Sequence, residues 1–330
     1  MPMSAKKIKV LGVGSPILDI LVNVDDSFIT SIKAAKGGME LTDAASIEGI
    51  LGKLKGRTSV APGGSSANTV FGLAQLGVPT AFLGKTGDDK QAALYKNTYE
   101  RMGGDLSMFK LNGKVATGRC LSMITPDSER TMRTDLGAAA TLVPEDITDA
   151  DFKGITHVHA EGYLLFNEKL TRAILEHAGK NNCTVSLDLS SFGVVNACKG
   201  ILAELLEKYV DIVFANEDEA KAFCGSDDPE KALEVLSGLC STVAVKLGKK
   251  GAILRSSGKT AKVDAELVKA VDTTGAGDLW QAGFLYGFLN GRALEDCGRF
   301  GSILGAEVVQ VVGAAIPEKR WLEIRKRIAG

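Results

Sequence analysis

The chain has 330 residues, of which 45% are hydrophobic and 24% are charged, and its formal net charge is −1. This length suits one large α/β domain or two ordinary ones. The small net charge gives no electrostatic reason to expect nucleic acid or an anionic membrane as a partner. Six cysteines without a Cys-x-x-Cys pair indicate buried thiols, not disulfides or zinc ligands. No apolar run is long enough for a membrane span and residues 1–9 lack a signal-peptide core, so we expect a cytoplasmic protein.

The N-terminal part begins with a short apolar strand, residues 8–14, that ends in glycines. These glycines match a dinucleotide-binding fingerprint only in part, because Ile17 stands where the third glycine belongs. The next apolar run has strand character and contains Asp19 as a lone carboxylate. A buried carboxylate without a partner is costly, so we expect Asp19 to face a ligand.

Two adjacent glycines, Gly63 and Gly64, precede Ser65, Ser66 and Asn68 at the start of a segment with helical periodicity. Glycine allows a backbone turn to press close to a neighbour. Asn68 would point from the first helical turn toward the same place. We also expect Ser65 or Ser66 to cap this helix. Capping alone does not require two glycines and an asparagine, so the stretch is a candidate ligand site.

The middle of the chain alternates between expected strands and helices. We expect a strand at 78–84, a helix within 87–102, and two strands at 117–124 and 129–136 whose polar turn makes them a flap outside the main sheet. The strand 155–161 carries His157 and His159 on one face, without a third metal ligand nearby in sequence. We therefore interpret the two histidines as half-buried residues at a strand edge.

Three further helix–strand units follow, and their alternation predicts an α/β fold with a doubly wound parallel sheet. The expected elements are helix 168–180 with strand 183–188, helix 199–208 with strand 210–214, helix 229–238 with strand 242–247, a hairpin at 252–264, and helices at 294–312 and 317–328. Ligands of such sheets gather beyond the carboxyl ends of the strands. The turns after Val13, Val60, Phe214, Leu247 and Val271 should therefore converge on one crevice.

The stretch 268–289 combines an apolar run, expected to be a strand, with a tight turn and the start of a helix. Gly275, Ala276 and Gly277 leave the backbone N–H groups uncovered, which at a helix N-terminus makes an anion hole. Asp278 would repel a stored anion, but beside a transferring phosphoryl group it can take the proton of the attacking hydroxyl. The alternative is an ordinary helix with Asp272 or Thr274 near the N-cap.

Asn216 and Glu219 stand three residues apart where an apolar strand gives way to a helix. A carboxylate and an amide there could hold hydrated Mg²⁺ beside phosphates, because Mg²⁺ keeps most of its waters. A helix cap with Asn216 and Glu219 as a capping box explains the same pattern equally well. The chain contains neither the P-loop motif nor the protein-kinase motifs.

Taken in order, these stretches resemble the motifs of the PfkB family of carbohydrate and nucleoside kinases, which has the ribokinase-like fold. The matching stretches are 63–68 for the N-terminal signature, 216–219 for the Mg²⁺ and phosphate motif, 246–251 for the loop beside the adenine, and 272–278 for the C-terminal signature. The resemblance extends from about residue 8 to residue 317. Residues 14–20, 117–120, 211–217, 313 and 316–319 look most like the adenosine kinases of that family.

The resemblance implies one kinase domain over residues 1–330, with a lid from segments near 16–45 and 115–136, acting as a monomer or homodimer. It implies transfer of the ATP γ-phosphate to a primary hydroxyl of a nucleoside, adenosine being converted to AMP. The base would be Asp278, and the anion hole would consist of Gly275, Ala276 and Gly277. The acceptor would be bound by Asp19, Gly63, Gly64, Ser65, Asn68 and Arg130. ATP would be bound by Asn216, Lys246, Gly248, Gly251, Thr274 and Ser302. Mg²⁺ would act through Asn216 and Glu219 by way of water, and a monovalent cation such as K⁺ is a further candidate cofactor.

Several positions depart from the family pattern. Ser15 replaces the asparagine of adenosine kinases, Ser302 replaces the asparagine near the adenine, and residues 279–282 replace a run of small residues. An aromatic residue should stack on the acceptor's base, and Tyr163, Phe166 and Phe192 are the candidates, although core positions would suit all three.

Two other functions are compatible with the sequence. One is a sugar kinase on the same scaffold, for ribose, fructose or a keto-deoxy sugar acid. The acid would need a cation, which Arg119, Arg130 or Arg133 could supply. The other is a nucleoside-sensing protein without turnover, for which an intact Asp278 would have no use.

Overall fold

Two sheets organise the chain in the computed structural model, which describes residues 7–54 and 56–329. The larger sheet has the strand order β15-β14-β13-β12-β11-β10-β1-β5. Its strands are β1 (Val10–Val13), β5 (Thr80–Leu83), β10 (His157–Glu161), β11 (Thr184–Asp188), β12 (Ile212–Asn216), β13 (Thr242–Lys246), β14 (Ala252–Ser256) and β15 (Lys259–Val263). Six neighbouring strands of this sheet pair in parallel, in the order β5, β1, β10, β11, β12 and β13. Strands β14 and β15 extend the sheet beyond β13 in antiparallel pairing. The predicted doubly wound α/β fold is confirmed.

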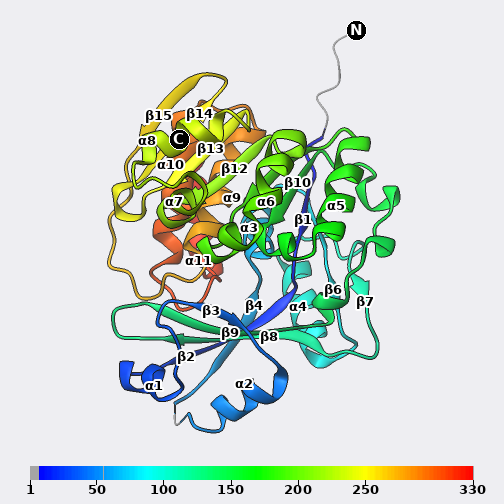
Figure 1. The fold of residues 1–330 in the computed structure, drawn as a ribbon, viewed down its shortest axis with the longest axis vertical. Helices are drawn as coiled ribbons and strands as arrows, with labels where there is room; N and C mark the ends of the chain where they lie inside the picture. Colours follow the sequence, from blue (N-terminus) through cyan, green and yellow to red (C-terminus); the bar gives the residue numbers. More distant parts are fainter. Residues whose placement is uncertain (1–6, 55, 330) are drawn as a thin grey trace.

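Helices cover both faces of this sheet (Figure 1). One core packs the sheet against α5 (Glu168–Lys180), α6 (Phe192–Tyr209), α7 (Glu217–Cys224) and α8 (Pro229–Ser237). The other packs it against α3 (Ser65–Gln75), α4 (Lys90–Arg101), α9 (Ala276–Leu289), α10 (Leu294–Val308) and α11 (Glu318–Ala329). Helix α5 shows why these segments fold as they do. Its buried residues Leu170, Ile174, Leu175 and Ala178 follow the helical period, and the side chain of Asn167 caps its N-terminus.

The smaller sheet has the order β3-β9-β8-β2-β4 and lies below the larger one in Figure 1. Its strands are β2 (Ile17–Asn23), β3 (Met39–Leu41), β4 (Ser59–Gly63), β8 (Thr117–Ile124) and β9 (Arg130–Gly137). The short helices α1 (Asp26–Ser31) and α2 (Ala44–Leu51) pack on it through a cluster that includes Val22, Ile29, Ile47, Leu121 and Met123. The expected flap is thus the β8–β9 hairpin. Strand β4 also belongs to this sheet, although it lies outside the segments 16–45 and 115–136 that were assigned to the lid.

Two glycines permit close backbone crossings where the chain passes between the sheets. Gly64 has φ +99°, and a Cβ atom there would lie 2.4 Å from the carbonyl oxygen of Ser15. Gly137 has φ +49°, and a Cβ atom would lie 2.3 Å from the carbonyl oxygen of Ala116. Only glycine combines such a φ with so little space. These crossings hold the smaller sheet against the carboxyl ends of the parallel strands.

Two details differ from the sequence-based expectations. Residues 264–271 form no strand; Val268 and Val271 are exposed, and Val271 N–H bonds the carbonyl of Val309 instead of a neighbouring strand. His157 and His159 are fully buried, because β10 lies inside the sheet between β1 and β11. Burial lowers the pKa of each histidine to about 3, so both are neutral. Ser186 Oγ lies 2.8 Å from a ring nitrogen of both.

Candidate active site

One cavity, with a volume of about 390 Å³, lies between the two sheets at the carboxyl ends of the parallel strands. Four neighbouring strands of the larger sheet each end in a polar residue that lines it: Glu161 on β10, Asp188 on β11, Asn216 on β12 and Lys246 on β13. The sequence-predicted site residues that line this cavity are Asp19, Gly64, Ser65, Asn68, Arg130, Asn216, Glu219, Lys246, Thr274, Gly275, Ala276, Gly277 and Asp278. Of the turns expected to converge here, those after Val13, Val60, Phe214 and Val271 contribute lining residues, although Val60 lies on β4 of the smaller sheet. The turn after Leu247 does not line the cavity.

The N-terminus of α9 opens into the cavity without a side-chain cap. Its N-cap residue is Gly275, in the left-handed region at φ +72°, while Gly277 is helical. The alternative, an ordinary helix capped by Asp272 or Thr274, is therefore wrong. Asp272 is instead buried within the loop, where its carboxylate accepts hydrogen bonds from Thr274 N–H and Oγ1 and from Gly313 N–H. Ala276 N–H donates to the carbonyl of Thr273 at 3.2 Å, whereas the N–H groups of Gly275 and Gly277 remain available to an anion.

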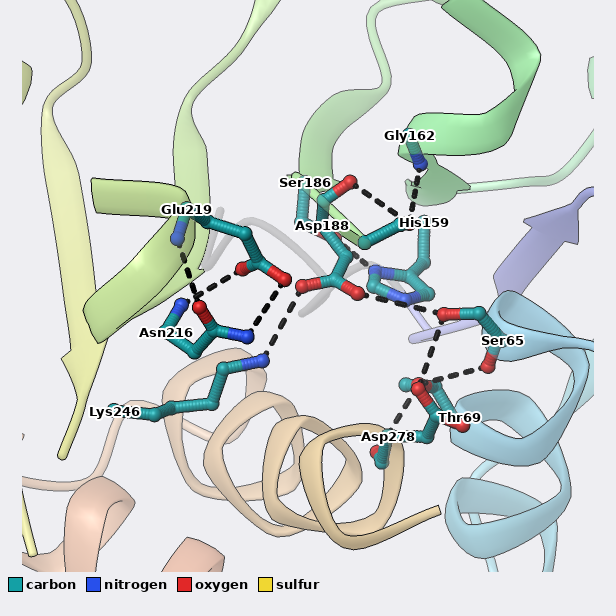
Figure 2. A network of polar contacts seen from close by, with 11 residues as sticks. Ser65, Thr69, His159, Gly162, Ser186, Asp188, Asn216, Glu219, Lys246 and Asp278 are labelled. Atoms are coloured by element: carbon teal, nitrogen blue, oxygen red, sulfur yellow. Dashed lines mark hydrogen bonds and ion pairs between the residues drawn. The ribbon is translucent and has the colours of Figure 1, made fainter. Parts of the chain in front are cut away.

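Asp278 lies in the first turn of α9 and is held by two side chains of α3, one of which, Ser65, is shown in Figure 2. Ser65 Oγ donates to its Oδ1 at 3.0 Å, and Asn68 Nδ2 donates to its Oδ2 at 2.8 Å. Burial raises the pKa of Asp278 to about 6, and nearby Asp188 adds to the rise, whereas the bonds from Asn68 and Ser65 oppose it. A carboxyl group with such a pKa can accept a proton near neutral pH.

The sequence predicts that Ser65 or Ser66 caps the N-terminus of α3. In the structure neither does. The N-cap of this helix is Gly64, without a side-chain bond, and Ser65 is engaged with Asp278. The cap comes from Glu161, whose carboxylate accepts from Ser66 N–H at 3.2 Å and from Ser15 N–H at 2.9 Å. Glu161 was missed by the sequence reasoning. The signal for it was a carboxylate at the end of an apolar strand.

Asp188 is the second carboxylate that the sequence reasoning missed, although it also ends a strand. Its Oδ1 lies 3.3 Å from Lys246 Nζ and its Oδ2 lies 3.4 Å from Ser65 Oγ. The contacts therefore run without interruption from Lys246 through Asp188 and Ser65 to Asp278, as Figure 2 shows. Four groups that are distant in sequence form one buried polar network.

Asn216 and Glu219 form the predicted capping box at the N-terminus of α7. Asn216 Oδ1 accepts from Glu219 N–H at 2.9 Å, and Glu219 Oε2 accepts from Asn216 N–H at 2.7 Å. Glu219 Oε1 accepts from Asn216 Nδ2 at 2.8 Å. Burial and the neighbouring Asp188 raise the pKa of Glu219. Because Glu219 is buried and both its oxygens are occupied, it could act on a metal only through water.

The smaller sheet contributes a carboxylate and a guanidinium to the cavity. Asp19 is almost fully buried, and a Cβ atom on Gly63 would lie 2.4 Å from its Cγ, so Gly63 makes room for this carboxylate. Burial raises the pKa of Asp19 to about 7, and Arg130 opposes the rise. The other two flap arginines form ion pairs with helix α2 and strand β3, Arg119 with Glu48 and Arg133 with Glu40.

Beside these polar groups the cavity has an apolar wall contributed by the smaller sheet, by residues 139–142, and by the segment 164–170 that follows β10. It consists of Met39, Leu41, Met132, Leu136, Ala139, Ala140, Leu142, Leu164, Phe166 and Leu170. Phe166 is 54% exposed, and Tyr163 also lines the cavity. Phe192 is 56% exposed but does not line it. Phe166 and Phe192 are therefore not core residues, contrary to one interpretation of the sequence. Phe166 and Tyr163 remain as candidates for the aromatic residue that stacks on the acceptor's base.

Comparison with known proteins identifies the family. Residues 39–321 match the model of the pfkB family carbohydrate kinases. The chain belongs to this family. Adenosine kinase of Saccharomyces cerevisiae is 28% identical over 93% of this chain and 96% of its own length. The crystal structure of adenosine kinase from Sinorhizobium meliloti is 33% identical, with a TM-score of 0.91 over 98% of this chain and 100% of that one. A probable sugar kinase from Rhizobium etli is 32% identical, with a TM-score of 0.91 over 98% of this chain and 99% of that one.

As a pfkB-family kinase, the chain is a phosphotransferase with a hydroxyl acceptor, which excludes the sensor without turnover. ATP is the phosphoryl donor that the family implies, typically with Mg²⁺. Within residues 7–54 and 56–329 no group of three or more His, Cys, Asp and Glu side chains is arranged to hold a metal ion, and no helix could cross a membrane.

Three residues predicted to bind the nucleotide lie outside the cavity of this pfkB-family kinase. They are Gly248, Gly251 and Ser302. A Cβ atom on Gly251 would lie 1.9 Å from the carbonyl oxygen of Val263, so β15 already requires a glycine there. Ser302 Oγ donates to the carbonyl of Asp264 at 3.0 Å and thereby ties α10 to the loop 264–271. These contacts give Gly251 and Ser302 structural roles that do not depend on ATP.

Proposed function

We propose that this kinase transfers the γ-phosphoryl group of ATP to the primary hydroxyl of a nucleoside, with adenosine as the acceptor. The observation that carries the proposal is the division of the cavity into a polar end and an apolar wall. A ribose needs carboxylates and amides for its hydroxyls, whereas a purine base needs an apolar slot with an aromatic face. Asp19 and Asn68 supply the first, and Phe166 with the leucines around it supplies the second.

In the proposed reaction Asp278 takes the proton of the acceptor hydroxyl as its oxygen forms a bond to the γ-phosphorus. The bond between that phosphorus and the bridging oxygen of ADP breaks, and ADP leaves with the electron pair. The N–H groups of Gly275 and Gly277, on either side of Ala276 at the start of α9, hold the oxygens of the transferring group. Mg²⁺, when bound with ATP, neutralises part of the phosphate charge, and Asn216 and Glu219 would orient its waters.

We also propose that the smaller sheet is a lid and that residues 1–330 form one kinase domain. Gly63, Gly64, Ser65 and Arg130 would then contact the acceptor from the lid and from α3. Gly248, Gly251 and Ser302 would contact ATP where it leaves the cavity, with Thr274 beside the phosphates. The K⁺ requirement and the choice between monomer and homodimer remain expectations from the family resemblance.

A sugar kinase is the second candidate, supported by the likeness to the probable sugar kinase of Rhizobium etli. The cavity argues against a keto-deoxy sugar acid, because Asp19, Glu161, Asp188 and Asp278 all line it. Arg119 and Arg133 are paired with glutamates, which leaves Arg130 and Lys246 to balance these carboxylates. A free ribose or fructose would leave the apolar wall unfilled.

The acceptor can be identified by thermal shift and turnover measured in parallel. A ligand at a hundredfold excess over its Kd stabilises the folded state by ~2.7 kcal/mol. Each kcal/mol shifts Tm by roughly 2–4 °C, or somewhat less in a domain this large. We expect saturating adenosine to raise Tm by several degrees and to give the fastest ADP release with ATP and Mg²⁺. Turnover and a thermal shift with a free sugar, and neither with any nucleoside, would contradict adenosine and leave the sugar kinase.

The pH dependence of the reaction should follow the protonation of Asp278. The base works only as the carboxylate, so kcat/KM should fall as the pH drops through about 6, where Asp278 takes up its proton. The Ser65 hydroxyl bond stabilises the carboxylate and lowers this pKa. In Ser65→Ala the pKa of Asp278 therefore rises and the acid limb of the profile moves to higher pH. Ser190→Ala, at a cavity residue that does not bond Asp278, is the control. An acid limb that stays in place in Ser65→Ala would assign it to another group.

A further inference from the structure

Lys246 lies where the phosphoryl group is expected, not at the adenine. It is the last residue of β13, and its side chain is 12% exposed. Figure 2 shows its ammonium group above the first turn of α9, directed toward Asp188. A Cβ atom added to Gly277 would lie 3.1 Å from Lys246 Nζ. The ammonium therefore lies against the same helix turn whose N–H groups have no cap.

The surroundings of Lys246 keep it charged. Burial lowers the pKa of its ammonium, but the carboxylates of Asp188, Glu219 and Asp278 outweigh burial and leave the pKa above its ordinary value. An ammonium carries three N–H donors. Among the described residues, Asp188 is the partner to which Lys246 Nζ donates. Since Lys246 lines the cavity, its other donors are available to a bound group.

We propose that Lys246 is a catalytic residue whose ammonium donates to an oxygen of the transferring phosphoryl group, and that Asp188 is the positioning residue that aims it. The proposal rests on the placement of that group at the start of α9. A cation fixed before the reaction stabilises charge in the transition state without reorganisation. The uncapped N–H groups and the ammonium would then donate hydrogen bonds to the phosphoryl group from two sides. The adjacent carboxylates alone would repel it.

A simpler role for Lys246 is to neutralise buried Asp188. Removing one member of a buried ion pair leaves an uncompensated charge and destabilises the protein, whereas removing both is often neutral. This difference separates the two roles. If Lys246 only neutralises Asp188, the double variant Lys246→Met/Asp188→Asn should recover activity along with stability. If Lys246 contacts the phosphoryl group, the double variant should recover stability alone.

The experiment compares Lys246→Met, the double variant and the wild-type protein. We expect Lys246→Met to lower kcat by roughly 10²–10³-fold, the loss typical of removing one such donor, with the acceptor KM little changed. The double variant should regain the Tm lost in Lys246→Met and remain inactive. ADP with aluminium fluoride and the acceptor mimics the transferring group. This complex should bind the wild-type protein much more tightly than ADP alone does. The gain in affinity over ADP should vanish in both variants. Lys326→Met, at an exposed lysine of α11 that is ion-paired with Glu323, is the matched control.

Besides an active Lys246→Met protein, two results would overturn the proposal. One is recovery of kcat to within tenfold of wild type in the double variant. The other is an undiminished gain in affinity from aluminium fluoride in Lys246→Met. All variants are assayed with whichever acceptor the wild-type protein turns over. A wild-type protein without adenosine turnover would contradict the acceptor proposal alone. An active Lys246→Met protein would contradict only the role of Lys246.

Discussion

Asp278→Asn should lower kcat by at least ~10²-fold and leave the acceptor KM little changed. General base catalysis contributes typically ~10²–10⁴-fold, and an amide cannot accept the proton of the acceptor hydroxyl. The substitution keeps the shape of the side chain, so α9 and α3 should still pack through the bond from Thr69 Oγ1 to the carbonyl of residue 278. Steady-state kinetics with ATP, Mg²⁺ and the acceptor separate the two constants. An interaction needed only in the transition state changes kcat and leaves KM alone.

The control is Asp218→Asn, which removes an exposed carboxylate in the first turn of α7. It should retain wild-type kcat, and both variants should keep a cooperative thermal transition. A tenth of the wild-type kcat corresponds to a loss of only ~1.4 kcal/mol in transition-state stabilisation. If Asp278→Asn keeps more than that tenth, another group removes the proton and the assignment of the base is wrong.

The parts of the site that the sequence predicts are those whose chemistry is local. The glycines at 63–64 and 275–277 show where the backbone is uncovered, and Asp278 follows one of these turns directly. The strand–helix alternation places these turns at one edge of a parallel sheet. Asp188 and Glu161 were missed because their roles depend on partners far away in the chain. Glu161 bonds Ser66 across 95 positions, and Asp188 bonds Lys246 across 58.

Local propensity also misleads where tertiary contacts decide. The run 268–271 has the β-branched composition of a strand, yet Val271 N–H bonds the carbonyl of Val309 in the segment after α10, and the run remains a loop. Ser65 and Ser66 are good capping residues, but Glu161 supplies the cap and frees Ser65 to bond Asp278. The same residue types would cap the helix in isolation. The distant carboxylate changes their role.

Gly277→Val should yield a folded protein with at least ~10²-fold lower kcat. Gly277 lies in helical conformation, so the substitution strains no backbone torsion, unlike one at Gly275. The first atom of the new side chain would already lie 3.1 Å from Lys246 Nζ, and the branched methyl groups would extend over the first turn of α9. They would cover the N–H groups that hold the phosphoryl oxygens and push the ammonium aside. Loss of one such donor costs roughly 10²–10³-fold in kcat.

A graded pair of variants and a matched glycine make the Gly277→Val test specific. Gly277→Ala adds only the Cβ atom, which the flexible end of Lys246 can accommodate, so its kcat should fall between those of wild type and Gly277→Val. Gly200, on α6, has no atom within 4 Å of an added Cβ, and Gly200→Val measures the effect of valine in a helix by itself. ADP affinity and Tm report whether the fold and the nucleotide site persist. No phosphoryl group could reach N–H groups beneath an isopropyl side chain. Wild-type turnover in a folded Gly277→Val protein would therefore contradict the assignment of the anion hole to this turn.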